Sequence, residues 1–506
     1  MTAPAPGKDA LTTDHHGECE LTADRMIGLL LDAGSFRCWD EPVRHDGADE
    51  AYGAALGRAR ERTGLDEAVT TGRGLLGGRP VAVVVSEFGF LGGSIGVATA
   101  ERITRAVERA TAERLPLLAL PVSGGTRMQE GTAAFLCMVR ISAAVLAHQE
   151  AGLPYLTYLR NPTMGGVFAS WGTLGHLVLA EPGARLGFLG PRAHQELRGV
   201  ELPAEVQLAE TLAARGLIDA VVPPEELAGA VGRALAVLTD PAGPAPAAAD
   251  RLPGPGPAPA DAWESVRRSR SPERPGTDAV LAAADPGRLE LAAPDPALAR
   301  ALVRFGGQPA VLVGQRPGAE RPFTAADLRT VRRTARLAEQ LGLPLVTLVD
   351  TSGAELSAQA ELDGLAVEIA RCLSTLVALR TPVLSVLLGQ GSGGGALALL
   401  PADLVLAAEH GWLAPLPPEG ASAIVHRDGT HAAELARSQG IGADALVAAG
   451  LVDRIVPEHP DAAAEPAAFA ARVAREIGLA LGELTNRPAE QRLTDRARRN
   501  RRLGGS

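Results

Sequence analysis

Apolar runs of strand length alternate with amphipathic helical stretches along this chain. Nearly continuous apolar runs at residues 79–85 and 343–349 predict strands that are buried on both faces. Apolar and small residues at three- and four-residue spacing, with arginines between them, predict helices at residues 101–113 and 328–339. Strands that alternate with helices in this way predict an α/β fold with mostly parallel sheets covered by helices.

The same order of elements occurs twice. In each half, three apolar runs led by proline are followed by turns of small residues. The corresponding landmarks, which lie 228 or 229 residues apart, are Pro80 and Pro309, Pro116 and Pro344, Gly124 and Gly353, Pro154 and Pro382, and Gly165 and Gly394. We therefore predict an internal duplication.

A proline-rich segment separates the two copies. Residues 240–261 contain seven of the 38 prolines in the chain. Such a run behaves as an extended, semi-rigid spacer and forms neither helix nor sheet. We predict a linker at residues 236–261 between a first domain at residues 21–235 and a second at residues 262–492. The basic segment after Arg492 is expected to be a solvated end.

Composition narrows the class of protein. The 506 residues, 46% of them apolar, suit two large domains, and the net charge of −10 argues against a general nucleic-acid binder. Four widely spaced cysteines make a disulfide framework improbable and favour a reducing compartment. Residues 1–16 lack the apolar core of a signal peptide, and the longest apolar runs are too short for a bilayer. We expect a soluble, cytoplasmic protein with no nucleic-acid or membrane partner.

Paired glycines at strand ends are the candidate site. The sequence contains neither a GxxxxGK[ST] phosphate loop nor an HExxH metal motif, whereas glycine turns recur at residues 123–125, 164–166, 352–354 and 393–396. Glycine lets the backbone approach a ligand and point its N–H groups at it, and a helix start adds positive partial charge. Each half would then hold an oxyanion hole, worth about 3 kcal/mol per donor. The alternative is that these glycines serve only steric needs of the turns.

Longer motifs around these glycines carry a family resemblance. SGGTRMQEG (residues 123–131) and PTMGGVFAS (residues 162–170) resemble the β subunit of bacterial acetyl-CoA carboxylase carboxyltransferase. VDTSGAE (residues 349–355) and GQGSGGGALAL (residues 389–399) resemble the α subunit of the same enzyme. The chain is therefore similar to a natural fusion of a β-type half and an α-type half.

The resemblance implies two duplicated crotonase-like domains, of the ClpP/crotonase superfamily, with the active site between them. It implies transfer of a carboxyl group from N-carboxybiotin to acetyl-CoA or a short acyl-CoA, giving malonyl-CoA from acetyl-CoA. Biotin would arrive on a separate biotin carboxyl carrier protein that a biotin carboxylase loads, and the fusion would form a homodimer. The implied thioester side is Gly124, Gly125, Gly165 and Gly166, and the implied biotin side is Gly394, Gly395 and Ala396, with Gly353 and Gly393 in support.

The sequence also departs from the family. The β subunit usually carries a four-cysteine zinc ribbon, but only His15, His16 and Cys19 stand in the corresponding place, so we predict no zinc. The family's DTPGAYPG reads DTSGAELS at residues 350–357, which could weaken the biotin half. Arg127, Gln129 and Glu130 follow the first glycine turn and would hold it in shape. The alternatives are a malonyl-CoA-type decarboxylase or crotonase-type hydratase on the same scaffold, or a degenerate partner subunit without turnover.

Overall fold

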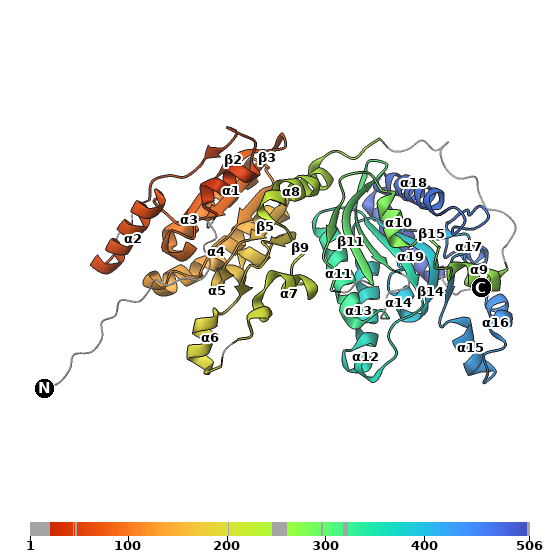
Figure 1. Cartoon of the computed structure of the whole chain (residues 1–506). Helices are drawn as coiled ribbons and strands as arrows, with labels where there is room; N and C mark the ends of the chain where they lie inside the picture. Colours follow the sequence, from red (N-terminus) through yellow and green to blue (C-terminus); the bar gives the residue numbers. More distant parts are fainter. Residues whose placement is uncertain are drawn as a thin grey trace.

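The computed structural model describes residues 21–43, 45, 48–200, 202–244, 261–294, 297–316 and 322–502. Two α/β halves lie side by side, and helix α8 (Pro224–Thr239) at the end of the first half packs on the strands of the second (Figure 1). The predicted α/β class with a duplicated architecture is therefore confirmed.

The first half is built on one seven-stranded sheet. Its first two strand pairings are antiparallel, and every later pairing is parallel. In spatial order the strands are β1 (Arg37–Cys38), β2 (Val69–Leu76), β3 (Arg79–Ser86), β4 (Leu117–Leu120), β5 (Tyr155–Leu159), β7 (Leu177–Ala180) and β9 (Ala220–Val221), with a small separate sheet of β6 (Thr163–Met164) and β8 (Leu186–Gly187). Its other helices are α1 (Ala23–Leu30), α2 (Glu50–Thr63), α3 (Val97–Ala112), α4 (Gly131–Glu150), α5 (Gly165–Phe168), α6 (Pro191–Arg198) and α7 (Ala209–Ala214).

The second half repeats this plan. The pairings again change from antiparallel to parallel after the second one. The strands are β10 (Leu289–Leu291), β11 (Leu298–Phe305), β12 (Gln308–Gln315), β13 (Leu345–Thr351), β14 (Val383–Ser392), β15 (Leu404–Ala408) and β17 (Arg454–Val456), with β16 (Trp412–Ala414) beside β14. The helices are α9 (Ala262–Ser269), α10 (Thr277–Ala282), α11 (Ala325–Gln340), α12 (Ala358–Leu362), α13 (Leu365–Ala378), α14 (Gly393–Leu397), α15 (Pro418–Val425), α16 (Ala432–Ser438), α17 (Ala443–Ala448), α18 (Pro466–Thr485) and α19 (Ala489–Arg502).

The apolar runs form the strands that the sequence predicts. Residues 81–86 of β3 are all buried, and so are all the residues of β13, as expected for strands covered on both faces. The predicted helices at residues 101–113 and 328–339 correspond to α3 and α11. Both helices begin earlier than predicted, at Val97 and Ala325, because their first turns carry few strongly apolar residues.

The structure fixes the alignment of the two copies. Equivalent positions differ by 229 residues in the first hairpin of each sheet and by 228 from the next strand crossover onward. The pairs that set this alignment are Leu76–Arg79 with Phe305–Gln308, and the bridges Ile95–Thr126 with Phe323–Ala354. Two predicted matches are therefore wrong by one residue: Gly353 corresponds to Gly125 and not to Gly124, and Gly165 corresponds to Gly393 and not to Gly394. Adjacent glycines allow the sequence match to slip by one position.

The predicted linker is shorter than residues 236–261. Helix α8 continues to Thr239, so residues 236–239 belong to the first half. The Gly243 N–H then donates to the Gly307 carbonyl oxygen at 2.9 Å, which places the chain against the second half. The proline-rich remainder, residues 245–260, lies outside the described residues, and α9 begins at Ala262.

The described part of the basic C-terminal segment, residues 493–502, is only partly solvated. It forms most of α19, on which Arg496 is only 2% exposed and bonds to the Asp403 carboxylate at 2.5 and 2.8 Å. Arg496 also donates to the Leu379 carbonyl oxygen at the end of α13. Arg492 lies four residues earlier on the same helix face and is also buried. The prediction missed this anchor because a run of arginines does not reveal which of them meet a buried aspartate.

Asp219 joins the two halves through charge. Its Oδ1 accepts hydrogen bonds from Arg300 at 3.3 Å and Arg333 at 2.9 Å, both in the second half. Its Oδ2 accepts from the Val178 N–H at 2.9 Å in β7. Apolar residues of α8 extend the contact, because they share one core cluster with β11 and β12. Charge pairing and apolar packing therefore fix how the halves meet.

Replacing Asp219 tests this junction. Asp219→Asn leaves the fully buried Arg300 guanidinium without its counter-charge, so we expect a loss of about 3–5 kcal/mol in the free energy of unfolding. Urea denaturation followed by circular dichroism measures it. Asp240→Asn removes a half-exposed pair with Arg79 and should cost about 0–1 kcal/mol. Equal losses in the two variants would contradict the assigned role of Asp219.

Candidate functional site

Two glycine turns meet in the first half, one after β4 and one at the start of α5. A Cβ atom built on Gly125 would lie 3.5 Å from the Cα of Gly165, and one built on Gly165 would lie 3.3 Å from the Cα of Gly125. The φ angles of these residues are +114° and +62°, a region that other residues rarely adopt. The structure therefore brings together the two turns that the sequence singles out.

Not all four glycines of this half have an amide N–H group that is available to a ligand. The Gly124 N–H donates to the Gly92 carbonyl oxygen at 2.8 Å, and the Gly125 N–H donates to Ser123 Oγ at 3.0 Å. Gly165 and Gly166 are the first two residues of α5, whose amides have no acceptor within the helix. Within the described residues, those two amides have no other recorded acceptor. Gly165 and Gly166 thus remain candidate donors, whereas the hydrogen bonds of Gly124 and Gly125 assign those residues to shaping the turn.

A buried ion pair holds this turn. Arg127 and Glu67 are both fully buried, and two hydrogen bonds of 2.6 and 2.8 Å join the guanidinium to the carboxylate. Arg127 also donates to the Ser94 carbonyl oxygen at 2.9 Å. Burial acts to raise the pKa of Glu67, but its hydrogen bonds and proximity to Arg127 lower the pKa below the usual value. The pair therefore stays charged and fixes the start of the turn.

Glu130 fastens the other end of the same turn. Its carboxylate accepts from the Val97 N–H at 2.5 Å, at the start of α3, and from the Tyr52 hydroxyl. Burial and the hydrogen bond to Glu130 raise the pKa of Tyr52 to about 12, so its phenol remains a donor. The predicted structural role of Arg127 and Glu130 agrees with these contacts. Gln129, predicted with them, is exposed and lines the cavity described below.

Sequence reasoning missed Glu67 and Tyr52. Both stand far from the glycine motif along the chain, and neither belongs to a recognisable pattern. The only local signal is an acidic residue, Glu67, two positions before the strand β2. A buried arginine needs a counter-charge, so an acidic partner for Arg127 could have been expected, but not located.

The second half brings its own two turns together. A Cβ atom on Gly395 would lie 3.5 Å from the Ala354 amide nitrogen, and one on Gly353 would lie 3.7 Å from Ser392 Oγ. The Gly353 N–H donates to Thr351 Oγ1 at 3.2 Å, as Gly125 does to Ser123. Gly353 therefore shapes this turn as Gly125 shapes the first.

The start of α14 supplies the candidate donors of this half. Gly393, Gly394 and Gly395 are its first three residues, where amides lack an acceptor within the helix. Ala396 is the fourth residue, where the amide gains an acceptor inside the helix, and its methyl group is fully buried. Ala396 thus packs inside the half, and its predicted donor role lacks support.

A group of buried hydrogen bonds supports the second-half turns. Gln315 donates to the Gly395 carbonyl oxygen at 3.1 Å and accepts from the Asp350 N–H at 3.2 Å. The Asp350 carboxyl accepts from the Gln390 N–H at 2.9 Å and fits only because position 389 is glycine, whose Cβ would lie 2.7 Å from it. Burial raises the pKa of Asp350 to about 7. The first half has Ser86 and Val122 at the equivalent positions, so this support is specific to the second half.

Within one chain the two pairs of turns do not meet. Helices α5 and α14 lie in different halves, well apart on the same side of the molecule (Figure 1). Each site glycine has close neighbours from its own half only, and no recorded hydrogen bond in the described part joins the turns of different halves. The expected site between the halves is thus not closed by a single chain.

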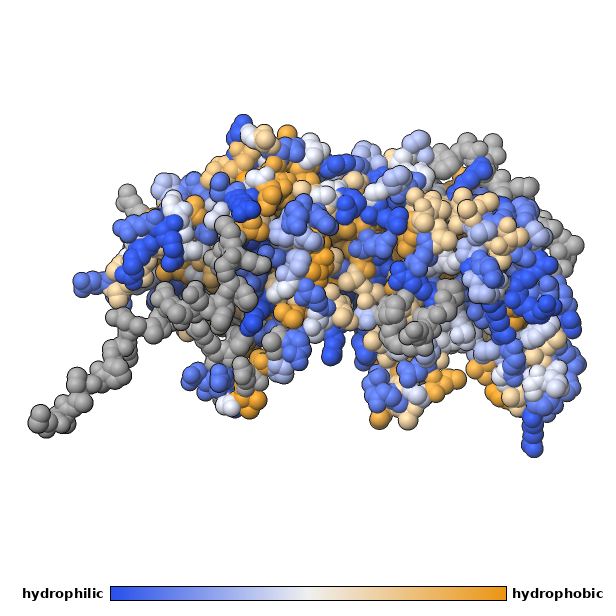
Figure 2. All heavy atoms as spheres, viewed as in Figure 1, coloured by the Kyte–Doolittle hydropathy of each residue, from blue (hydrophilic) through white to orange (hydrophobic). Residues whose placement is uncertain are grey.

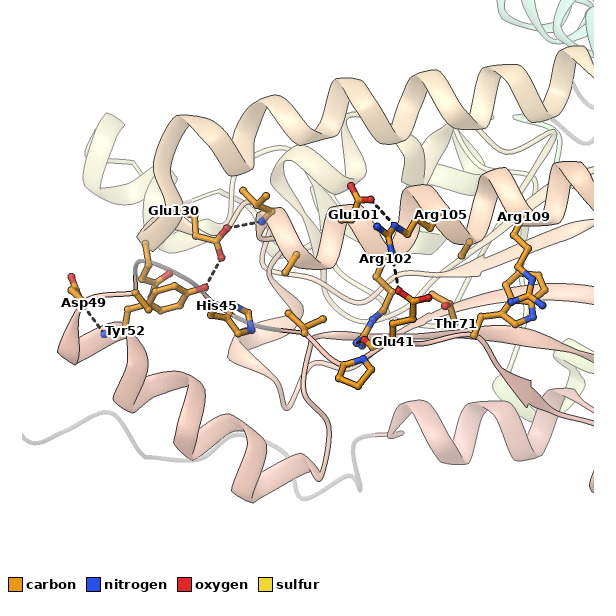
Figure 3. A pocket seen from close by; sticks show the side chains of 18 residues that line it. Glu41, His45, Asp49, Tyr52, Thr71, Glu101, Arg102, Arg105, Arg109 and Glu130 are labelled. Carbon is orange, nitrogen blue, oxygen red and sulfur yellow. Dashed lines mark hydrogen bonds and ion pairs between the residues drawn. The ribbon is translucent and has the colours of Figure 1, made fainter.

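A cavity of about 820 Å³ lies between α2, α3 and the segment around Trp39, with Glu130 in its lining. Figure 3 shows Tyr52 pointing to Glu130 at one end, and Arg105 bonded to Glu101 and Glu41 farther along. The glycine turns do not line this cavity. Each of its three arginines, Arg102, Arg105 and Arg109, is already paired with a carboxylate in the lining or just outside it, so the cavity has no evident anion site.

Ser94 lies in a sequence motif that is typical of a serine nucleophile. Residues 92–96 match G-x-S-x-G, the signature of serine hydrolases. The Ser94 hydroxyl donates to the Leu91 carbonyl oxygen at 2.8 Å and accepts from Arg127 at 3.4 Å. No histidine is among the recorded partners of Ser94 in the described part of the chain. The serine therefore belongs to the structural support of the turn.

Among the described residues, no group of three or more His, Cys, Asp or Glu side chains could hold a metal ion. The zinc prediction concerns His15, His16 and Cys19, which lie outside the described residues. It stays a prediction.

Comparison with known proteins decides the family. A profile described as the carboxyl transferase domain matches residues 14–493, nearly the whole chain. The chain belongs to the carboxyl transferase domain family. The expected likeness to fused β-type and α-type carboxyltransferase subunits is confirmed, because the match runs through both halves.

Relatives of this carboxyl transferase cover almost its full length. A probable biotin-dependent acyl-coenzyme A carboxylase beta3 subunit of Mycobacterium tuberculosis is 55% identical over 96% of this chain and 99% of its own. The acetyl-coenzyme A carboxylase carboxyl transferase subunits beta/alpha of Salinispora arenicola are 40% identical over 96% of this chain and 91% of theirs. The solved transcarboxylase 12S, with methylmalonyl-coenzyme A and methylmalonic acid bound, has a TM-score of 0.75 at 23% identity, over 92% of this chain and 90% of that one. The crotonase-like fold class is thereby confirmed.

The buried Asp350 predicts a pH dependence of stability. Because burial raises its pKa from 3.8 to about 7, the folded carboxyl transferase binds this proton more tightly than the unfolded chain. The associated stabilisation is complete below the unfolded pKa and is lost as the pH rises through the folded one. Asp350→Asn, which is always neutral, should therefore show a smaller fall in Tm between about pH 5 and pH 8 than the unmodified chain. Asp363→Asn removes an exposed carboxylate as a control, and an equal fall in all three proteins would contradict the prediction.

Proposed function

We propose that this chain is the carboxyltransferase component of a biotin-dependent acyl-CoA carboxylase. It would transfer a carboxyl group from N-carboxybiotin, delivered by a separate carrier protein, to the α-carbon of acetyl-CoA or a short acyl-CoA. A biotin carboxylase would load that carrier, and we expect the complex in the cytoplasm. The observation that carries this proposal is that both halves present unpaired helix-start amides beside a positive-φ glycine.

The two sets of amides suit two carbonyl-bearing reactants. Carboxybiotin supplies carbon dioxide and a base for the α-proton, so the protein needs to provide little acid–base chemistry. The amides of Gly165 and Gly166 would hold the thioester oxygen as it becomes enolate-like. The amides of Gly393 and Gly394 would hold the ureido oxygen. Positioned donors of this kind stabilise charge without reorganising during the reaction.

The hydratase alternative requires a carboxylate that faces the thioester. Glu130 is the acidic residue nearest to the first-half motif along the chain, but its carboxylate already accepts from the Val97 N–H and the Tyr52 hydroxyl. Glu130 is therefore unsuited to activate water. The decarboxylase and degenerate-subunit alternatives differ from our proposal in whether carboxyl groups reach biotin, which an assay decides.

A homodimer would complete the site. Met128 and Leu356 occupy equivalent positions after the turns of the two halves and are 80% and 89% exposed. Val139 and Val367 are likewise equivalent, apolar and exposed, on α4 and α13. Apolar residues also gather at the lower end of the second half, over α12 (Figure 2). We propose that a second copy covers these surfaces, so that the first-half turn of one chain faces the second-half turn of the other.

Helix α4 has one buried face and one exposed apolar face. Residues Met128–Glu150 are long and apolar enough to cross a membrane by length and composition. One face of α4 packs inside the half through Ala134, Met138 and Ile141. Its opposite face exposes apolar side chains, Phe135 and Val139 among them. Contact with a second chain would account for that apolar face.

The activity test uses malonyl-CoA and free biotin. The protein should move the carboxyl group to biotin and release acetyl-CoA. Gly166→Val should lower this rate about 100-fold, because a branched side chain at the start of α5 obstructs the amide donors. Gly57→Ala, on α2 where a Cβ meets no atom within 4 Å, should keep the rate. Decarboxylation of malonyl-CoA without carboxylated biotin would instead favour the decarboxylase, and no turnover by intact protein the degenerate subunit.

The dimer test mixes two inactive variants. Gly166→Val damages the first-half turn and Gly394→Val the second-half turn, so each homodimer should be inactive. After unfolding and refolding together at equal amounts, half of the dimers are mixed and hold one undamaged site. About a quarter of the normal rate should therefore return. No recovery, with dimers present by analytical ultracentrifugation, would contradict a site shared between copies.

A further inference from the structure

Ser392, the last residue of β14, carries a buried hydroxyl that nothing satisfies. The residue is 1% exposed, and its Oγ has no hydrogen-bond partner among the described residues. Buried hydroxyls are normally bonded, and an unpaired one lowers stability. Within the described part, Ser86, Thr157 and Thr381 share this property, but Ser392 alone directly precedes a glycine turn of the candidate site. A ligand bound at that turn would supply the missing hydrogen-bond partner.

The hydroxyl lies in the gap between the two second-half turns. Ser392 Oγ would be 3.7 Å from a Cβ atom on Gly353, the shaping glycine of the first of these turns. Ser392 is also the N-cap of α14, yet its side chain makes no capping bond. Gly393 follows it with a φ of +63°, so the chain turns sharply and the first amides of α14 start beside the hydroxyl. The hydroxyl and these amides thus lie next to the same gap between the two turns.

The first half lacks this hydroxyl. The residue equivalent to Ser392 is Met164, which likewise precedes a positive-φ glycine at the start of a short helix. Thr163 and Ser123 form the bridge that corresponds to Gly391 and Thr351, which fixes this equivalence. A buried hydroxyl next to the turn is therefore specific to the second half, and so is any ligand contact that it makes.

We propose that Ser392 donates a hydrogen bond to the carbonyl oxygen that the second-half turns bind, beside the amides of Gly393 and Gly394. This inference rests on the proposed function, in which that oxygen belongs to the ureido group of biotin. As the bond between the carboxyl carbon and the ureido nitrogen breaks, carbon dioxide leaves and the electron pair moves toward the ureido oxygen. A hydroxyl donor fixed at that oxygen stabilises the growing charge. Ser392 would then be a catalytic residue of the second half.

Ser392→Ala tests this role with two readouts. In the reaction of malonyl-CoA with free biotin, we expect kcat to fall about 100-fold while the KM for malonyl-CoA stays unchanged. Because the lost hydroxyl has no partner in the fold, the Tm should stay the same or rise. A structural role would give the opposite pattern, a lower Tm with an unchanged rate per folded molecule.

Ser385→Ala is the matched control. Ser385 is a buried serine on the same strand, but its hydroxyl donates to the Leu399 carbonyl oxygen at 3.3 Å. This variant should lose Tm and keep its rate per folded molecule. If the unmodified chain transfers carboxyl groups and Ser392→Ala keeps the full rate, the inference is wrong and the proposed function stands. If the unmodified, folded chain transfers none, the proposed function itself is wrong.

Discussion

Close approach of two backbone turns in each half is the constraint on which the candidate site depends. In the first half the Cα atoms of Gly125 and Gly165 stand where any side chain would meet the opposite turn. Positive φ angles at both positions independently exclude most residues. Because of this geometry, the short helix α5 starts beside the turn after β4, and its first amides have no acceptor within the helix. Sterics, rather than reactive side chains, therefore define the site.

The two halves hold this shared geometry by different means. Arg127 and Glu67 clamp the first-half turn with a buried ion pair, whereas Gln315 and Asp350 support the second-half turns through hydrogen bonds. A full negative charge behind the start of α14 would oppose a developing oxyanion there. The raised pKa of Asp350 lowers that charge near neutral pH. The two halves thus share the geometry of their turns but differ in the residues that support them. A duplicated protein that binds two different reactants would require such a difference.

Much of the fold and part of the site could be predicted from the sequence. Strands buried on both faces need apolar residues, and turns with a positive φ favour glycine. The duplication and the glycine turns can therefore both be recognised in the sequence. The match of Gly353 was misplaced by one residue because adjacent glycines are interchangeable in a sequence pattern. Glu67 and the inward-facing Arg496 were missed because a buried ion pair joins residues far apart along the chain. The sequence likewise does not show that the Gly124 amide is already bonded to the Gly92 carbonyl oxygen, because that contact depends on the fold.

The junction between the halves is the structural reason for including a second copy in the proposed function. Asp219, bonded to Arg300 and Arg333, and the packing of α8 fix the halves so that their turns lie apart within one chain. A twofold axis can place the first half of one chain opposite the second half of another, and it then forms the same contact twice. In the proposed dimer, the surfaces that the second copy covers lie beside the turns of both halves. Val139 and Val367 are apolar and exposed at equivalent positions, although the residues that support the turns differ between the two halves.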